Sequence, residues 1–227
     1  MKRSRFQLWL SLPAVLLLIA QPRPSQAGMI LDQGFDPTGQ ITLSAGFGGI
    51  NSNQYRAQTF QVGMSGTLVE IDVFVRRFEA TPVGGNLVFE LRRLTSTGAP
   101  SNLAEDSLLQ VHIPSTDVGT SLVFLPINVS PANLHVNAGD SFAIVLHASA
   151  DTPSGLTYQW NGQNTNVYGN GGSFEQVVGN HSWGGGSPSL DLGFETFVST
   201  VPEPGALMLS AMGALFLAGY WCHWRRA

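Results

Sequence analysis

The sequence predicts an all-β protein: an antiparallel β-sandwich of jelly-roll type, flanked by an N-terminal signal peptide and a C-terminal single transmembrane helix. Apolar and polar residues alternate with a period of two through most of the central region, which is typical of strands with one buried face. Clusters of Gly, Pro, Asn and Ser separate these runs and indicate turns. No run of similar length shows the period of an amphipathic helix.

Composition is consistent with one globular domain between two tails. The chain has 227 residues, of which 43% are hydrophobic and 11% are charged. The hydrophobic share is enough for a core of ordinary size, whereas the low charge, 26 glycines and 13 prolines disfavour a coiled coil or a charge-rich disordered chain. We expect a signal peptide at 1–27, an extracytoplasmic sandwich at 28–200 and a sorting tail at 201–227.

The N-terminal segment has the three parts of a secretory signal. Three basic residues within the first five precede an uncharged, mostly apolar run at 6–20, and a polar stretch ends at Ser25-Gln26-Ala27. Small residues at positions −3 and −1 predict cleavage between Ala27 and Gly28. A permanent membrane anchor is the weaker interpretation, because the run is short for a span.

Seven alternating runs carry the strand prediction, and they cover 67–77, 87–92, 109–113, 123–129, 142–146, 156–160 and 192–198. Together with the intervening turn signals they indicate about eight to ten short strands in a sandwich. Pro126 lies inside one run and predicts an edge strand or a bulge there, because proline cannot donate to a strand ladder. The 172 residues from 29 to 200 are generous for a seven-stranded immunoglobulin-type domain. A jelly roll, in which the first and last strands often lie close together, is therefore preferred.

The central domain is acidic and has no cysteine. Residues 29–200 hold five arginines, no lysine and 14 acidic residues, a formal charge of −9. Such a charge argues against nucleic acid as a partner. The single cysteine, Cys222, lies in the tail, so core packing rather than a disulfide must stabilise the domain.

No catalytic constellation is evident, and the sequence predicts a protein that is not an enzyme. Its central histidines are scattered, without metal-ligand spacing. Gly139-Asp140-Ser141 predicts a tight turn rather than a nucleophile. The adjacent carboxylates Glu105 and Asp106 are better interpreted as solvated loop residues, so a polysaccharide-active enzyme is the remote alternative.

No cofactor is predicted apart from a weak candidate for structural calcium. If the first and last strands pair, Asp32, Asp36 and Asp191 could share a Ca²⁺ ion with backbone carbonyls. The alternative interpretation is three unrelated surface carboxylates.

Four aromatic residues are candidates for glycan binding, because flat rings can stack on sugars. Tyr158 and Trp160 share an apolar strand face and are better interpreted as core residues. Tyr168 and Trp183 lie in glycine-rich segments, where we expect them to be exposed.

The C-terminal segment combines three features in order. Val201-Pro202-Glu203-Pro204-Gly205 precedes an uncharged, mostly apolar run at 206–222, and the basic end at 223–227 contains Arg225 and Arg226. Seventeen helical residues span roughly 25 Å, slightly less than the ~30 Å of a hydrocarbon core. The two arginines should stay cytoplasmic, which leaves the domain on the outer side of that membrane.

This order resembles the PEP-CTERM sorting tail, also named after the C-terminus of ice-binding proteins: a Pro-Glu-Pro motif, one apolar helix and a basic terminus. The resemblance covers about the last 27 residues. It implies a Gram-negative exporter, recognition by an exosortase-type membrane peptidase, and a link to exopolysaccharide and biofilm. It says nothing about ice binding.

The segments 57–62, 137–146 and 158–162 are also loosely similar to exported β-sandwich and carbohydrate-binding domains, which implies a fold class and not a ligand. The sequence therefore predicts an exported protein held transiently in the inner membrane by its tail. Processing by an exosortase would then release it to the cell surface or the extracellular matrix. A carbohydrate-binding module that recognises exopolysaccharide is the alternative.

Overall fold

The structure is a computed structural model that describes residues 28–47, 54–78, 85–152, 157–165, 167–177, 182–187 and 190–200. The predicted signal peptide, with Ala27, lies outside the described residues. So do the predicted sorting motif, transmembrane helix and basic end at 201–227.

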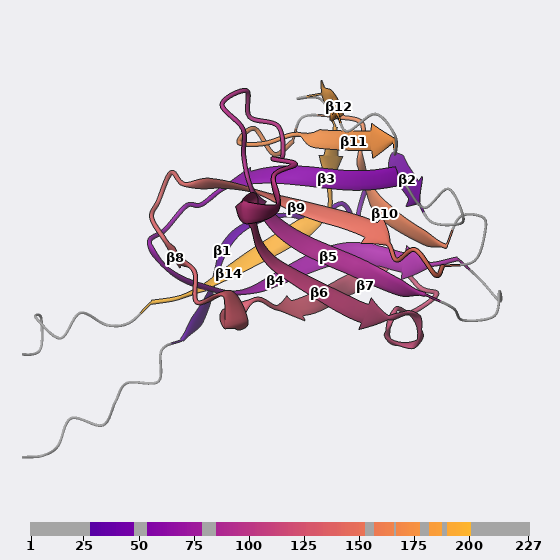
Figure 1. Ribbon diagram of the computed structural model, residues 1–227, viewed down its shortest axis with the longest axis horizontal. Coiled ribbons are helices and arrows are strands. Elements are labelled where there is room, and N and C mark those ends of the chain that lie inside the picture. The colour runs from indigo at the N-terminus through magenta and orange to yellow at the C-terminus, as the bar shows by residue number, and fades with distance from the viewer. Residues whose placement is uncertain are drawn as a thin grey trace, which may run out of the picture.

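The described residues form two antiparallel sheets, which confirms the predicted sandwich (Figure 1). The eight-stranded sheet contains β1 (Met29–Phe35), β2 (Leu43–Phe47), β4 (Gly66–Arg77), β7 (Val123–Asn128), β8 (His135–Val136), β10 (Tyr158–Gln163), β13 (Asp191–Leu192) and β14 (Phe194–Ser199). The six-stranded sheet contains β3 (Gln54–Gln61), β5 (Asn86–Arg93), β6 (Ser107–Pro114), β9 (Ser141–Ala148), β11 (Ser173–Val177) and β12 (Gly184–Ser187). Three short 3₁₀ helices, η1 (Ala104–Asp106), η2 (Ser115–Asp117) and η3 (Ser130–Ala132), connect strands.

The strand order in each sheet shows which strands are neighbours. The eight-stranded sheet runs β1-β14-β4-β10-β13, with β2 paired to β10 and with β7 and β8 paired to β4. The six-stranded sheet runs β12-β11-β3-β9-β5-β6. Most neighbouring strands are far apart in the sequence, so long-range pairing builds both sheets.

The core lies between the inner faces of the two sheets. Its largest fully buried side chains are Trp160, Tyr158, Phe60, Phe89 and Phe194. Burying one large apolar side chain contributes about 1.5–3 kcal/mol. Residues 29–200 contain no cysteine, so this apolar core, and not a disulfide, stabilises the domain.

Strand β4 departs from the predicted alternation at its N-terminal end. If the alternation of Ile71, Val73 and Val75 continued, Val69 would also face the core, but Leu68 is fully buried and Val69 is only half-buried. The cause is a bulge: Phe197 pairs with Glu70 and Val198 with Leu68, so Val69 is an extra residue opposite β14. The carbonyl of Val69 instead accepts hydrogen bonds from Val129 N and Ser130 Oγ.

Two local predictions are confirmed. Strand β7 pairs only with β4 among the described strands, so Pro126 lies on an edge strand as expected. The segment 137–140 is a tight turn, closed by the hydrogen bond from Asp140 N to Asn137 O at 3.0 Å. Gly139 has φ of +97°, a conformation that favours glycine.

The first and last strands lie side by side, as predicted. Strand β1 pairs antiparallel with β14, with Met29 opposite Ser199 and Phe35 opposite Phe194. Figure 1 shows these two strands running together to the lower left. Both ends of the described domain therefore lie at the same end of the sandwich.

Candidate functional site

The outer face of the six-stranded sheet carries a second apolar cluster. Three small residues, Ala57, Ala143 and Val145, are buried there, and half-buried Tyr55, Leu94, Phe174 and Trp183 pack against them. Phe174 is opposite Ala57 on β3, and Ala57 is opposite Val145 on β9. Small side chains thus leave room for large rings on this face. We call Tyr55, Phe174 and Trp183 the outer aromatic cluster.

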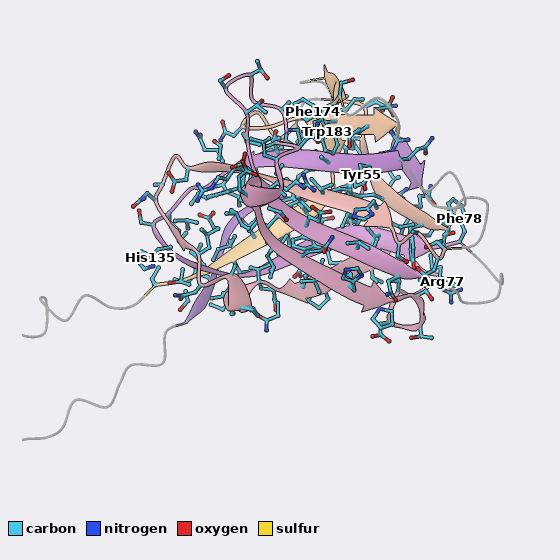
Figure 2. The ribbon with its side chains drawn as sticks, in the orientation of Figure 1. Tyr55, Arg77, Phe78, His135, Phe174 and Trp183 are labelled. Atoms are coloured by element: carbon cyan, nitrogen blue, oxygen red, sulfur yellow. The ribbon has the colours of Figure 1, made fainter. Side chains whose placement is uncertain are left out.

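Hydrogen bonds hold Trp183 on this face. Its indole Nε1 donates to Asn102 Oδ1 at 2.9 Å, and Gln176 Nε2 donates to the same oxygen at 3.1 Å. The Trp183 ring meets Tyr55 edge-on, with centroids 6.4 Å apart. Figure 2 shows Tyr55, Phe174 and Trp183 grouped over β3 and β11. Half-exposed rings beside amide side chains can stack on a sugar and bond its hydroxyls.

A buried ion network lies beside this cluster. Glu90 is only 3% exposed. Its Oε2 is 2.5 Å from the Arg92 guanidinium, and its Oε1 is 3.0 Å from His147 Nε2. The other His147 nitrogen, Nδ1, is 3.0 Å from the carbonyl oxygen of Ala148. The centroid of the His147 ring lies 4.3 Å from that of Tyr55, so the ion network is in direct contact with the outer aromatic cluster.

The surroundings shift the ionisation of two groups in this region. Burial alone would raise the pKa of Glu90, but the hydrogen bond from His147 and the positive charge of Arg92 outweigh it and lower the pKa below 4.5. Burial and the nearby Glu90 carboxylate raise the pKa of Tyr55. Glu90 is therefore a carboxylate at neutral pH and Tyr55 is a neutral phenol.

Of the four predicted aromatic residues, Trp183 alone remains a candidate for glycan contact. Tyr158 and Trp160 are 0% exposed, which confirms the core interpretation. Burial raises the pKa of Tyr158 to about 12, and Trp160 Nε1 donates to Gly193 O at 2.8 Å.

The expectation that Tyr168 is exposed is wrong. It is buried, its ring is perpendicular to Phe194 at 5.0 Å, and its hydroxyl accepts from Gln61 N at 3.1 Å. The reason is a distant carboxylate: Asp191 Oδ2 accepts hydrogen bonds from the amides of Val167 and Tyr168, each at 2.8 Å. This contact holds the glycine-rich segment against the sandwich.

Sequence reasoning missed Tyr55, and it noted Phe174 among the aromatic residues of this region without selecting it as a candidate. Tyr55 is the second residue of β3, and Phe174 stands alone among polar residues. Only the pairing of β11 with β3 brings both rings together. An aromatic residue on the polar side of an alternating run was the available signal.

The structure does not bring the three predicted calcium ligands together. Asp32 accepts from the amides of Gly63 and Met64, Asp36 caps Thr38 N, and Asp191 is buried. Within the described part of the chain, no group of three His, Cys, Asp or Glu side chains could hold a metal ion. Asp32 and Asp36 therefore bind nearby backbone amides, and Asp191 is enclosed in the core, where it also binds backbone amides.

A separate group of carboxylates lies on the outer face of the eight-stranded sheet. Burial, Glu70 and Glu195 together raise the pKa of Asp72 to about 6. Asp72 is opposite Glu195 on β14 and opposite Pro126 on β7. The shift follows from burial and like charges, and it is evidence of crowding rather than of a ligand.

Comparison with protein families identifies a sorting motif in the C-terminal part of the chain. The PEP-CTERM protein-sorting motif matches residues 200–226. No curated protein matches the chain. Over the residues that the structure describes, no helix is long and apolar enough to cross a membrane.

The motif implies processing by an exosortase, a membrane protein, and export with sorting toward the cell surface. The matched segment begins directly after β14, the strand that pairs with β1. The chain therefore carries a PEP-CTERM protein-sorting motif, and a two-sheet antiparallel β-sandwich precedes this motif.

Proposed function

We propose that this protein is a non-enzymatic component of the cell surface or extracellular matrix, released there after an exosortase removes its tail. The observation that carries the proposal is the sorting motif at 200–226. The sandwich is suited to such release. Its last strand, β14, ends at Ser199, directly before the matched segment begins at residue 200.

The position of the chain ends supports the same route. Met29 is opposite Ser199, so the predicted signal cleavage site and the sorting motif leave the domain at one end. Pro202 to Pro204 follow Ser199, the last residue of β14, within five positions along the chain. Both processing reactions can therefore occur at the membrane with the folded domain pointing away from it.

Intact mass spectrometry of the protein from a host with a working exosortase tests this proposal. We expect a C-terminus near residue 204, or a modified remnant, and an N-terminus at Gly28. A Pro202→Ala/Pro204→Ala variant should accumulate as the unprocessed chain in the membrane fraction, because the extended segment that the peptidase recognises is lost. Pro131→Ala, an exposed proline in η3, is the matched control. Wild-type protein that still ends at Ala227 would refute the proposal.

The outer aromatic cluster favours a second candidate function, the binding of exopolysaccharide. Tyr55, Phe174 and Trp183 are half-buried rings on a sheet face away from the core. Asn102 and Gln176 place amide groups beside them. This combination of ring faces and amides is the chemistry that recognises sugars.

Calorimetric titration with exopolysaccharide from the producing strain tests this second function. We expect saturable heat from the wild type and about a two- to tenfold loss of affinity in Trp183→Ala, since one stacked ring contributes about 0.5–1.5 kcal/mol. Phe124→Ala is the control, because Phe124 is a half-buried ring on the outer face of the other sheet, against Phe74. Absence of heat from folded wild-type protein would leave the structural role alone.

A further inference from the structure

A small pocket lies at the C-terminal end of β4. It has a volume of about 310 Å³ and is lined by Arg76, Arg77, Phe78 and Thr120. This size is at the lower end of the ~300–1,000 Å³ that is usual for ligand pockets. Figure 2 shows Arg77 and Phe78 at the right-hand end of the molecule, away from the outer aromatic cluster.

Both arginines are held in place through one nitrogen. Arg76 Nε donates to Gln159 Oε1 at 2.6 Å, and the Arg76 guanidinium carbon lies 5.5 Å from the centre of the Phe78 ring. Arg77 Nε makes a long contact of 3.4 Å to the carbonyl oxygen of Val118. Gln159 is only 6% exposed. These two contacts hold the Arg76 and Arg77 guanidinium groups in place through Nε. Among the described residues, the terminal nitrogens of the two groups contact no carboxylate.

The strand end explains how two successive arginines reach one pocket. Successive residues of a strand point to opposite faces. Arg77, however, is the last residue of β4, and Phe78 turns toward β10 through a hydrogen bond from its amide to Thr157 O at 2.8 Å. The chain therefore leaves the sheet where both side chains border the same hollow.

The charge of this pocket is unusual for the domain. Arg56 is paired with Glu175, and Arg92 is paired with Glu90. Asp117 and Asp151, close to this end of the sandwich, instead contact Thr116 Oγ1 and Ser149 Oγ. In a domain with a formal charge of −9, the adjacent Arg76 and Arg77 bring two positive charges to the lining of one pocket.

We propose that this pocket binds the carboxylate of a uronic acid in an acidic polysaccharide. A guanidinium fork matches a carboxylate in a bidentate manner, and the Thr120 hydroxyl offers a partner for a sugar hydroxyl. The choice of a polysaccharide rests on the proposed function at the cell surface or in the matrix.

The test uses the full-length chain in a nonionic detergent, titrated by calorimetry with trigalacturonate at low salt. We expect saturable binding that weakens at 0.3 M NaCl, and no comparable heat from maltotriose, which has the same length and no charge. In Arg76→Gln/Arg77→Gln the affinity should fall at least tenfold. Arg93→Gln is the matched control, because Arg93 is an exposed arginine at the end of β5, and its affinity should equal that of the wild type.

Further variants and probes cover the other outcomes. Should the double variant unfold, Arg76→Lys and Arg77→Lys keep the charge but remove the fork, and each should bind more weakly than the wild type. Equal affinity in wild type and all arginine variants, or absence of binding by the wild type, would overturn the proposal. So would tighter binding of hexaglutamate, which would indicate an acidic peptide, or equal binding of inorganic sulfate, which would indicate a free anion. Processing of the tail does not enter this assay, so its result and that of the mass measurement are independent.

Discussion

Glu90→Ala is expected to lower the free energy of unfolding by about 3–5 kcal/mol at pH 7, because it leaves the half-buried side chains of Arg92 and His147 without their shared carboxylate partner. Arg92 and His147 both contact this carboxylate, and Glu90 is 3% exposed. Arg92 NH1 also donates to Ser101 O at 2.8 Å, so the loss should loosen the segment that carries Asn102. Urea unfolding monitored by circular dichroism measures the effect.

A matched variant separates burial from charge. Glu175 also pairs with an arginine, Arg56, but its side chain is 55% exposed, so Glu175→Ala should cost only about 0–1 kcal/mol. Similar losses for the two variants would contradict the role given to the buried network. Glu90→Gln keeps an acceptor oxygen and should cost about 1–3 kcal/mol.

The pH dependence of this effect has a definite sign. The folded pKa of Glu90 lies below its ordinary value of 4.5. A carboxylate with a lowered folded pKa stabilises the protein fully above its unfolded pKa, and that stability is lost as the pH falls through the folded pKa. The difference between wild type and Glu90→Gln should therefore be constant from pH 6 to 8 and shrink below about pH 4.5. A difference that grows in acid would contradict this assignment.

Asp191→Ala is expected to destabilise the protein by about 2–4 kcal/mol, since it removes the acceptor of two backbone amides at a buried position. Asp191 is 0% exposed, and its Oδ2 accepts from Val167 N and Tyr168 N. Without these bonds the segment that holds Tyr168 against Phe194 should detach first. Thermal unfolding and hydrogen exchange at the Tyr168 amide measure the two effects.

Asp32→Ala is the matched control. Asp32 likewise accepts from two successive amides, those of Gly63 and Met64, but it is half-buried, so the loss should be about 1 kcal/mol.

Burial raises the pKa of Asp191, and hydrogen bonds from the amides of Tyr168 and Val167 partly offset this increase. Its charged form is therefore disfavoured in the folded state, and its contribution to stability is lost as the pH rises through the folded pKa. Asp191→Asn, which keeps an acceptor oxygen without the charge, should remain close to wild type at pH 7. Equal losses in Asp191→Ala and Asp32→Ala would contradict the effect of burial.

Strand positions followed from the sequence because alternation is local. The runs at 87–92, 109–113 and 142–146 lie inside β5, β6 and β9, and Pro126 correctly predicted an edge strand. The predicted alternation failed at Val69, where a bulge depends on the partner strand β14, and at Val123, which is exposed at the start of the edge strand β7. Nothing within residues 67–77 encodes the residues that lie opposite them.

The candidate sites depend on pairing across long sequence distances. Tyr55 meets Trp183 because β3 pairs with β11 and β11 with β12. Glu90 meets His147 because β5 pairs with β9. Tyr168, expected in solvent, is buried because Asp191 accepts its amide hydrogen bond.

By itself, the sequence determined the all-β class and, through a contiguous segment that needs no folding partner, the sorting motif at 200–226. Tertiary structure alone decided which side chains share a face, which carboxylates are buried, and that Arg76 and Arg77 border one pocket. The physical reason is the distance along the sequence between the residues that determine each feature. Strand alternation and a sorting motif are encoded by residues a few positions apart, whereas sheet register joins residues far apart in the sequence, such as Glu90 and His147 at 57 positions or Gln33 and Thr196 at 163 positions.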